Sequence, residues 1–396
     1  MKSKIGVLCS YSFPEGMAPT TRIIAYGNGL VQNGCEVEVV INSPYCRDSI
    51  KKTSGEIKGL KYRYPFLYNT KLYPRRWYRW LYANWMLYIK CLIAVIKSNR
   101  KKRYDCVLLS FDTPRDLIVY GMFLRLFGIR TVFIGDEFPE EIRQLKGQVS
   151  RHNIILYKIA YRFISGRVLM TRALREYYDN IVCKKPSFIL SSVIDTSRFD
   201  SLKIEVQPRN YLCYMGNLML AKDNVDNIIR AFYLIKDKYP NLDLFLYGTP
   251  NEEDLKIVKD LISELGVEDR VMLKGRAKYD DVPNILANAR INVTSQPITK
   301  RAEGGFPTKM CEYMLANVPC ILTDAGEITN YVQDEVTAYI VERCNPDAYA
   351  KKLDYILSNY KKALVVAENA RKYVLDNFGS KQATSGLVDF IKNQIL

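Results

Sequence analysis

The stretch from Glu303 to Val341, EGGFPTKMCEYMLANVPCILTDAGEITNYVQDEVTAYIV, carries the clearest structural signal in the chain. Gly304 and Gly305 lack a Cβ, so they predict a loop whose backbone can come close to a ligand. Pro307 favours the first position of a helix, and apolar residues at helical spacing extend that helix to about residue 317. A second proline ends the helix, and the apolar run after it predicts a buried strand. The stretch therefore predicts a glycine loop, a helix, a strand, a loop, a short helix and a strand.

Lys309 lies in the first turn of the predicted helix, where the helix dipole disfavours a cation. Glu312 follows three residues later, in the less favourable order for an ion pair along a helix. A lysine is expected here if an anion lies in front of the helix, because free N–H groups, the dipole and an ammonium together bind phosphate. The alternative is a solvated lysine on the helix surface. The residues alone leave both interpretations open.

These residues resemble the donor-binding motif of GT-B glycosyltransferases of family 4, which use nucleotide sugars. The matching residues are Gly305-Phe306-Pro307-Thr308-Lys309, Glu312-Tyr313-Met314, Pro319, Thr323-Asp324, Gly326-Glu327 and Tyr339-Ile340-Val341. The resemblance implies that Glu312 binds the nucleotide ribose, and that the donor is also contacted by Glu303, Gly304, Gly305, Phe306 and Lys309. The family's other glutamate falls at position 304, which is glycine here, and Glu303 is one place away. The chain is similar to a subset that reads Pro-x-Lys-x-x-Glu-Tyr.

The length of 396 residues is enough for two domains that each bury a core. A hydrophobic content of 48% and a charged content of 25% are ordinary for a soluble globular protein. The ten cysteines form no C-x-x-C pair and His152 is the one histidine, which argues against zinc, Cys–His catalysis and a disulfide framework. The N-terminus enters a strand directly, so we expect no signal peptide and a cytoplasmic location.

The first half of the chain opens with a strand over residues 4–9, a helix over 20–33 and a strand over 36–41, which predicts a parallel sheet. The loop before the helix contains Gly16 and resembles the family's first loop, in which a glycine lies against the cleft between the domains. An ordinary surface loop is the alternative interpretation.

Asp136 and Glu137 follow a strand predicted over residues 131–134. Carboxylates at the carboxyl end of a parallel strand lie where open α/β sheets bind their ligands, so this pair is a candidate catalytic site. Many members of the family have a histidine near this position, and this chain does not. The alternative is a helix N-cap with an acidic first turn.

The second half begins with a strand over residues 211–215, followed by Gly216 and Asn217. In the family, this loop presents an arginine and a lysine to the donor diphosphate. Lys222 matches the lysine, whereas Asn217 stands at the arginine position and brings no charge. Arg276 follows a later strand, at the place where members of the family hold the nucleobase.

The resemblance implies an α/β protein with two Rossmann-like domains facing each other across a cleft. We expect an acceptor-binding domain over residues 1–200, a donor-binding domain over 201–375 and a C-terminal helix over 376–396 that packs back on the first domain. The implied reaction is retaining transfer of a sugar from a nucleoside diphosphate to an acceptor hydroxyl, in cell-surface polysaccharide or glycolipid assembly. Lys222, Lys309 and the helix N-terminus are expected to stabilise the leaving diphosphate, so neither a metal nor another cofactor is expected.

No residue can be named as a nucleophile, which favours a front-face mechanism over a covalent intermediate without deciding between them. A second hypothesis is a related protein that binds a nucleotide sugar or an anionic surface without turnover, as the glycine at 304 and Asn217 suggest. Nucleotide-sugar hydrolysis or epimerisation on the same fold is a third.

The positive charge lies entirely in the first half: residues 1–200 contain 33 Lys+Arg and 16 Asp+Glu, and the remainder contains 25 and 26. Residues 51–103 contain 15 Lys+Arg and one acidic residue. A helix predicted over 77–98 mixes aromatic and basic residues, which suits the headgroup layer of a bilayer, but its charges interrupt any membrane span.

We therefore expect either a peripheral position on an anionic membrane surface, with a glycan or lipid-linked acceptor, or a core helix beside a basic acceptor site. The basic residues come with no nucleic-acid recognition motif, so no nucleic-acid partner is expected.

Overall fold

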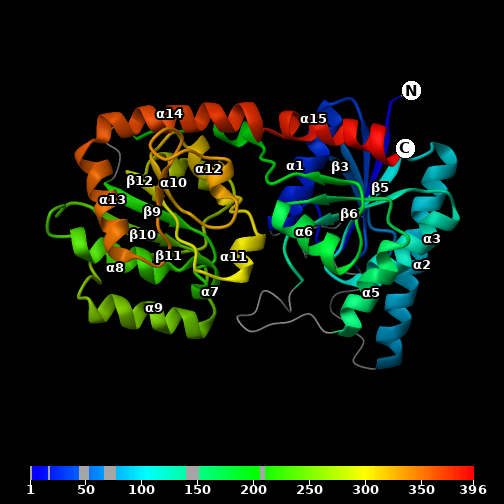
Figure 1. Ribbon diagram of the computed structural model, residues 1–396, viewed down its shortest axis with the longest axis horizontal. Helices are drawn as coiled ribbons and strands as arrows, with labels where there is room; N and C mark the ends of the chain where they lie inside the picture. The colour runs from blue at the N-terminus through cyan, green and yellow to red at the C-terminus, as the bar shows by residue number, and fades with distance from the viewer. Residues whose placement is uncertain (1, 17, 44–52, 67–76, 140–150, 206–209) are drawn as a thin grey trace. The chain divides into compact units, whose positions relative to one another are not determined.

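The computed structural model describes residues 2–16, 18–43, 53–66, 77–139, 151–205 and 210–396. These residues form two compact units (Figure 1). One unit holds the described residues before Ile194 together with Gly379–Leu396, and the other holds Ile194–Phe378. The sequence had placed the corresponding boundaries after residues 200 and 375.

The first unit is built on an eight-stranded sheet. In spatial order its strands are β3 (Ser54–Ile57), β4 (Leu60–Arg63), β2 (Glu36–Ile41), β1 (Lys4–Cys9), β5 (Cys106–Ser110), β6 (Thr131–Gly135), β7 (Gly166–Leu169) and β8 (Ser187–Ile189). All neighbouring strands are parallel except β3 and β4, which form an antiparallel hairpin. The chain order reverses between β1 and β5, which makes their carboxyl ends the expected ligand edge of this sheet.

The sequence analysis did not predict the β3–β4 hairpin. Lys58 and Gly59, at the tip, have φ of 48° and 81°. Two positive φ values are typical of a type I′ turn. The turn went unrecognised because lysine, rather than asparagine or aspartate, precedes the glycine.

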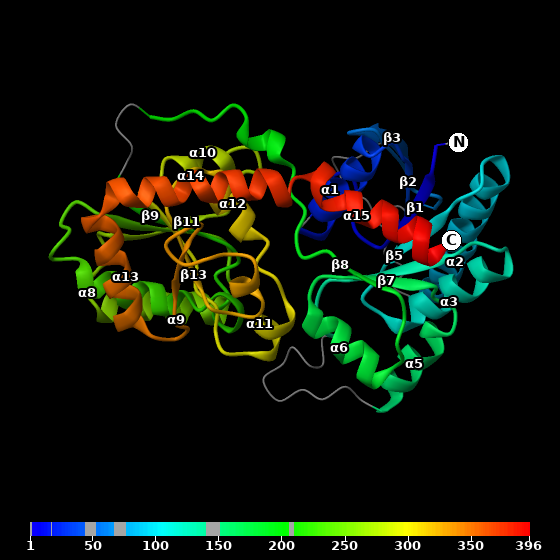
Figure 2. The ribbon, with the colours of Figure 1, turned by 45° about the horizontal axis from the view of Figure 1, so that its top comes forward.

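The helices of the first unit are α1 (Ala18–Gln32), α2 (Trp77–Lys101), α3 (Pro114–Leu126), α5 (Arg151–Tyr161), α6 (Arg172–Ile181) and α15 (Ser380–Phe390), which continues into η3 (Ile391–Ile395). Figure 2 shows α15 lying along α1. The two helices touch so closely that a Cβ on Gly29 would lie 2.0 Å from the carbonyl oxygen of Ser380. Asn33 Nδ2 donates to the Lys381 carbonyl at 2.8 Å. The predicted return of the last helix to the first domain is confirmed.

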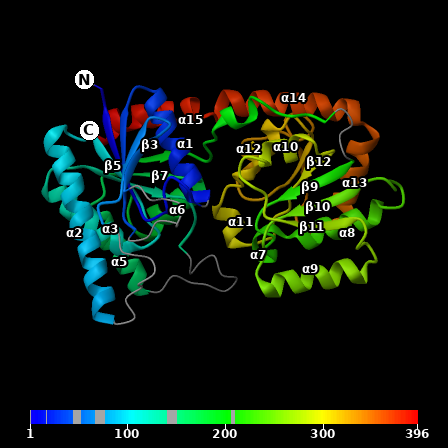
Figure 3. The same cartoon turned by 180° about the vertical axis from the view of Figure 1, so that it is seen from behind.

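The second unit is built on a six-stranded, all-parallel sheet (Figure 3). In spatial order its strands are β11 (Val271–Gly275), β10 (Asp243–Tyr247), β9 (Tyr211–Met215), β12 (Ile291–Val293), β13 (Cys320–Thr323) and β14 (Tyr339–Val341). The order of a doubly wound sheet is evident: the chain first moves from β9 outward to β11, then returns to the other side of β9. Ligands of such sheets bind at the carboxyl ends of the strands where the order reverses, here between β9 and β12.

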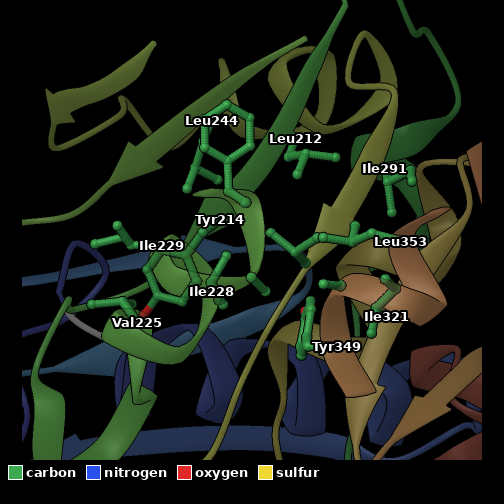
Figure 4. Packing of buried hydrophobic residues seen from close by; sticks show 14 of the residues in the cluster. Leu212, Tyr214, Val225, Ile228, Ile229, Leu244, Ile291, Ile321, Tyr349 and Leu353 are labelled. Atoms are coloured by element: carbon green, nitrogen blue, oxygen red, sulfur yellow. The ribbon is translucent and has the colours of Figure 1, made fainter. Parts of the chain in front are cut away.

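The helical segments of the second unit are η1 (Thr196–Phe199), α7 (Leu220–Asp223), α8 (Val225–Ile235), α9 (Glu252–Glu264), α10 (Val282–Ala287), α11 (Lys300–Gly304), α12 (Lys309–Leu315), η2 (Ile328–Asn330), α13 (Pro346–Ser358) and α14 (Tyr360–Asn377). Figure 4 shows Tyr214 and Leu244 of the sheet packed with Val225 and Ile228 of α8. Burial of this side of the sheet holds the carboxyl end of β9 in place. The two α/β units confirm the predicted fold class.

Of the two glycines in the predicted loop, only Gly305 lies outside a helix. Gly304 is the last residue of α11, and Gly305 has an extended φ of −92°. The next helix begins at Lys309 rather than at Pro307, which instead accepts a turn hydrogen bond from Met310 N at 2.8 Å. The threonine between them is helical in φ and ψ but precedes the first full turn.

Candidate functional site

The loop after β9 closes over the side chain of Lys309. A Cβ on Gly216 would lie 2.6 Å from Lys309 Nζ and 2.1 Å from the hydroxyl of the fully buried Tyr214, so a larger residue here would have to displace both side chains. Lys309 Nζ lies 2.6 Å from Asp223 Oδ1 and 3.3 Å from the Tyr214 hydroxyl, and it also lies 4.6 Å from the centre of the Tyr214 ring. Asp223 and Tyr214 thus fix the Lys309 ammonium at the ligand edge of the sheet.

Asp223 explains how a lysine is tolerated in the first turn of α12. Its side chain is 3% exposed, and that of Lys309 is 19% exposed. Burial alone would raise the pKa of Asp223, but the charge and hydrogen bond of Lys309 outweigh it, so the pKa lies below its usual value. The interpretation of Lys309 as a solvated surface residue is therefore wrong. The anion that faces this lysine belongs to the protein, which the sequence analysis did not foresee.

The remaining residues of the β9 loop lie beside this pair. Asn217 N donates to Asp223 Oδ2 at 3.3 Å, while the Asn217 side chain is exposed. Lys222 is half-buried on α7, and its charge also lowers the pKa of Asp223. The structure therefore brings together four of the predicted donor residues, in the order Gly216, Asn217, Lys222 and Lys309.

Glu312 is paired with an arginine that the sequence analysis did not select. Glu312 Oε1 lies 2.5 Å from Arg198 Nη1. The Arg198 guanidinium lies 3.7 Å from the centre of the Tyr279 ring and donates to the Tyr279 carbonyl at 2.8 Å. Arg198 comes from η1, which the Asp195 side chain caps. No local sequence signal marks this arginine, because its partner is 114 residues away.

The other predicted donor residues lie at separate places on the unit. The Glu303 side chain on α11 is 44% exposed and pairs with Lys300 at 2.6 Å. The Phe306 ring is buried among aromatic rings, 5.1 Å from the ring of Tyr331, so this side chain belongs to the core. Arg276 is exposed just after β11, at the edge of the sheet.

In the first unit, Asp136 follows β6 and lies 3.1 Å from Arg22 Nη1. Arg22 Nε also donates to the Tyr26 hydroxyl at 2.8 Å. Burial raises the pKa of Asp136 above its usual value, with a further contribution from the charge of Glu137, while Arg22 opposes the rise. Asp136 is therefore a better proton acceptor than a solvated carboxylate.

Tyr11 lies in the loop after β1, near the same carboxyl edge. Burial raises its pKa, and the charges of Asp112 and Asp136 raise it further. Gly16, in the same loop, closes on α1: a Cβ there would lie 2.0 Å from Thr20 Oγ1. The alternative role of residues 136–137 as a helix N-cap concerns residues 140–150, which lie outside the described residues. In the part of the chain that the structure describes, no three His, Cys, Asp or Glu side chains gather as metal ligands would.

Residues 197–373 match the family model described as glycosyl transferases group 1. The matched residues lie within the second unit. Arg198, Lys222, Lys309 and Glu312 of the glycosyltransferase lie in the matched region, and Asp136 lies outside it. The predicted enzyme class and GT-B fold are confirmed.

The glycosyltransferase is 22% identical over 393 residues to N-acetyl-alpha-D-glucosaminyl L-malate synthase of Bacillus anthracis, a match that covers 97% of this chain and 95% of that protein. Its fold is similar to HepE of Anabaena in complex with UDP and glucose, with a TM-score of 0.72, 14% identity, and coverage of 98% of this chain and 99% of that one. It is also similar to sucrose-phosphate synthase of Thermosynechococcus elongatus, with a TM-score of 0.72, 13% identity, and coverage of 99% and 98%.

Proposed function

We propose that this glycosyltransferase moves a sugar from a nucleoside diphosphate to an acceptor hydroxyl, with retention of the anomeric configuration. The observation that carries the proposal is the cluster of Lys309, Lys222 and the glycine-containing β9 loop at the carboxyl edge of the second sheet. Cations and backbone N–H groups together are the usual partners of a diphosphate. The HepE structure, which holds UDP on a similar fold, supports the same donor class.

Glu312 is assigned to the ribose. One of its carboxylate oxygens, Oε1, is fixed by Arg198, and Oε2 makes no hydrogen bond within the described residues. An oriented carboxylate oxygen suits a ribose hydroxyl donor. Arg276 is assigned to the nucleobase, and Glu303 would exchange its pair with Lys300 for hydroxyls of the donor sugar.

Asp136 and Glu137 are assigned to the acceptor, which the first unit would bind. The raised pKa of Asp136 favours a role in accepting a proton from an acceptor hydroxyl. Lys222 and Lys309 would stabilise the leaving diphosphate without a metal ion. A front-face mechanism, in which the leaving phosphate also helps to deprotonate the acceptor, fits a site with no assigned nucleophile.

To test the proposed transfer, the protein is incubated with a panel of UDP-, GDP- and dTDP-sugars, with and without acceptors. The release of nucleoside diphosphate is then measured. The acceptors are lipid-linked glycans and L-malate, because the Bacillus anthracis relative is named for joining an N-acetylglucosaminyl group to L-malate. We expect release that depends on both one donor and one acceptor, and an anomeric proton coupling in the product that matches the donor. Binding without release would support the non-catalytic alternative, and release without acceptor would support hydrolysis.

A membrane-surface position is proposed from the exposed side of α2. Along this helix, the buried face packs on the sheet through Leu87, Cys91 and Val95. Large apolar side chains that are 40–62% exposed follow a second stripe of the helix, the α2 outer stripe, made of Tyr78, Leu81, Tyr82, Trp85, Ile89 and Ile93. The buried face of α2 thus supports the interpretation as a core helix. The exposed face supports the proposal of a helix at a membrane surface.

Basic residues accompany the α2 outer stripe. Lys90, Lys97, Arg100 and Lys101 are exposed on the same helix, and Arg125 is exposed on α3, which packs beside α2. None of the described helices is long and apolar enough to cross a membrane. Apolar and basic side chains on one surface suit the headgroup layer of an anionic membrane, on the cytoplasmic side, where a lipid-linked acceptor would be available. The basic residues at 51–52 and 71–76 lie outside the described residues.

Sedimentation with vesicles tests this surface. We expect binding to vesicles that contain anionic lipid, with each nearby Lys or Arg contributing about 1 kcal/mol, and loss of binding as salt rises, because salt screens these charges. The double variant Tyr82→Ser/Trp85→Ser should reduce binding. The matched control is Val365→Ser on α14, another exposed apolar residue, which should bind like the wild type. Equal recovery in the supernatant with neutral and anionic vesicles would instead support a basic acceptor site.

A further inference from the structure

We propose that Asp223 is a positioning residue that fixes Lys309 against the β9 loop and partly neutralises it, so that the nucleoside diphosphate product is released. This inference rests on the proposed donor site. Asp223 itself does not touch the donor: it acts through Lys309 and through the backbone of the loop.

The geometry limits what Lys309 can bind. An ammonium has three N–H groups. Asp223 Oδ1 and the Tyr214 hydroxyl lie within hydrogen-bond distance of Nζ, which leaves one N–H for a ligand. Gly216 lies directly beside Nζ, because a Cβ built on it would come within 2.6 Å of that atom, so Nζ lies at the β9 loop. A phosphate at this loop would meet a cation whose position is already set.

Asp223 also holds the loop. Its second oxygen accepts from the backbone N–H of Asn217, so one buried carboxylate orients both a candidate phosphate-binding side chain and the loop beside it. Replacing this residue by asparagine keeps its size and one acceptor oxygen for Lys309, but it removes the charge and puts an NH2 donor in place of the oxygen that accepts from the Asn217 N–H.

The charge of Asp223 at the same time weakens the attraction of the site for a phosphate. A carboxylate 2.6 Å from the ammonium offsets much of the field that Lys309 exerts on a phosphate, and it does so strongly because the carboxylate is 3% exposed. Buried ion pairs contribute little stability compared with apolar side chains of the same volume, so stability alone is a weak reason for this pair. A transferase must release its product after each turnover, and moderated phosphate binding serves that need.

The test is Asp223→Asn, with UDP and GDP as probes in titration calorimetry at several salt concentrations. We expect the variant to bind its nucleotide about tenfold more tightly, because the unopposed ammonium attracts the phosphates more strongly. The affinity should also depend more steeply on salt. In steady-state assays, both KM and kcat should fall, because product release becomes slower.

Asp243→Asn is the matched control. Asp243 pairs with Arg270 at 3.2 Å at the start of β10, at the opposite end of the strand from the ligand edge. This variant should bind nucleotide like the wild type.

Unchanged or weaker binding by a folded Asp223→Asn protein would overturn the proposal, since a purely structural pair predicts that result. If the asparagine variant does not fold, Asp223→Ser, which also removes the charge, is measured in its place. Failure of both variants to fold would assign the pair to stability and also overturn the proposal. Absence of nucleotide binding by the wild type would instead refute the proposed donor site.

Discussion

Lys309→Ala is expected to weaken nucleoside diphosphate binding by about 1.5–3 kcal/mol, the range for a hydrogen bond with a charged partner. The structure adds a cost in stability, because the substitution leaves the buried Asp223 carboxylate without its ammonium. Breaking a buried ion pair costs about 3–5 kcal/mol, and partial exposure of Lys309 and protonation of Asp223 should reduce this figure. Titration calorimetry gives the affinity, and urea unfolding gives the stability.

The control for Lys309→Ala is the double variant Lys309→Ala/Asp223→Asn, which removes both charges. It should recover much of the stability, because no buried carboxylate is left unpaired, but it should not recover the affinity. If a folded Lys309→Ala protein binds nucleotide as tightly as the wild type, Lys309 is a structural partner of Asp223 and has no part in binding the donor.

Glu312→Gln is expected to lower kcat/KM by at least about tenfold, which corresponds to about 1.4 kcal/mol. The substitution preserves the shape of the side chain but removes the charge that makes the carboxylate a strong acceptor for ribose hydroxyls. It also leaves Arg198, which is mostly buried, without its ion partner. Steady-state kinetics with the preferred donor from the panel measures the effect.

Donors that lack one ribose hydroxyl separate these two consequences. In the wild type, removal of the hydroxyl that Glu312 binds should lower kcat/KM, and in Glu312→Gln the same removal should have a smaller effect. Glu335→Gln is the control. Glu335 also pairs with a cation, Lys362 at 2.8 Å, but this lysine lies on α14 and has no proposed role in binding the donor. A Glu312→Gln enzyme with wild-type turnover would show that Glu312 serves only to hold Arg198.

Much of the fold was predictable because buried parallel strands are short apolar runs with clear ends. Strands β1, β2 and β9 begin and end where the sequence analysis placed them. The β3–β4 hairpin was missed, since its strands are short and its Lys58–Gly59 turn is a weak signal. Phe306 was predicted to contact the donor, and its ring instead lies in the core, because sequence does not show where an aromatic side chain points.

The sequence by itself determined the two-domain α/β architecture, the enzyme class and the position of Lys309 in the first turn of a helix. Only the tertiary structure identified the partners of the site residues, Asp223 for Lys309 and Arg198 for Glu312. These pairs join residues 86 and 114 positions apart. Helix and strand periods act over a few residues and leave a signal in the sequence. A contact between distant charges depends instead on where the parallel sheet brings its loops together, and no local pattern records it.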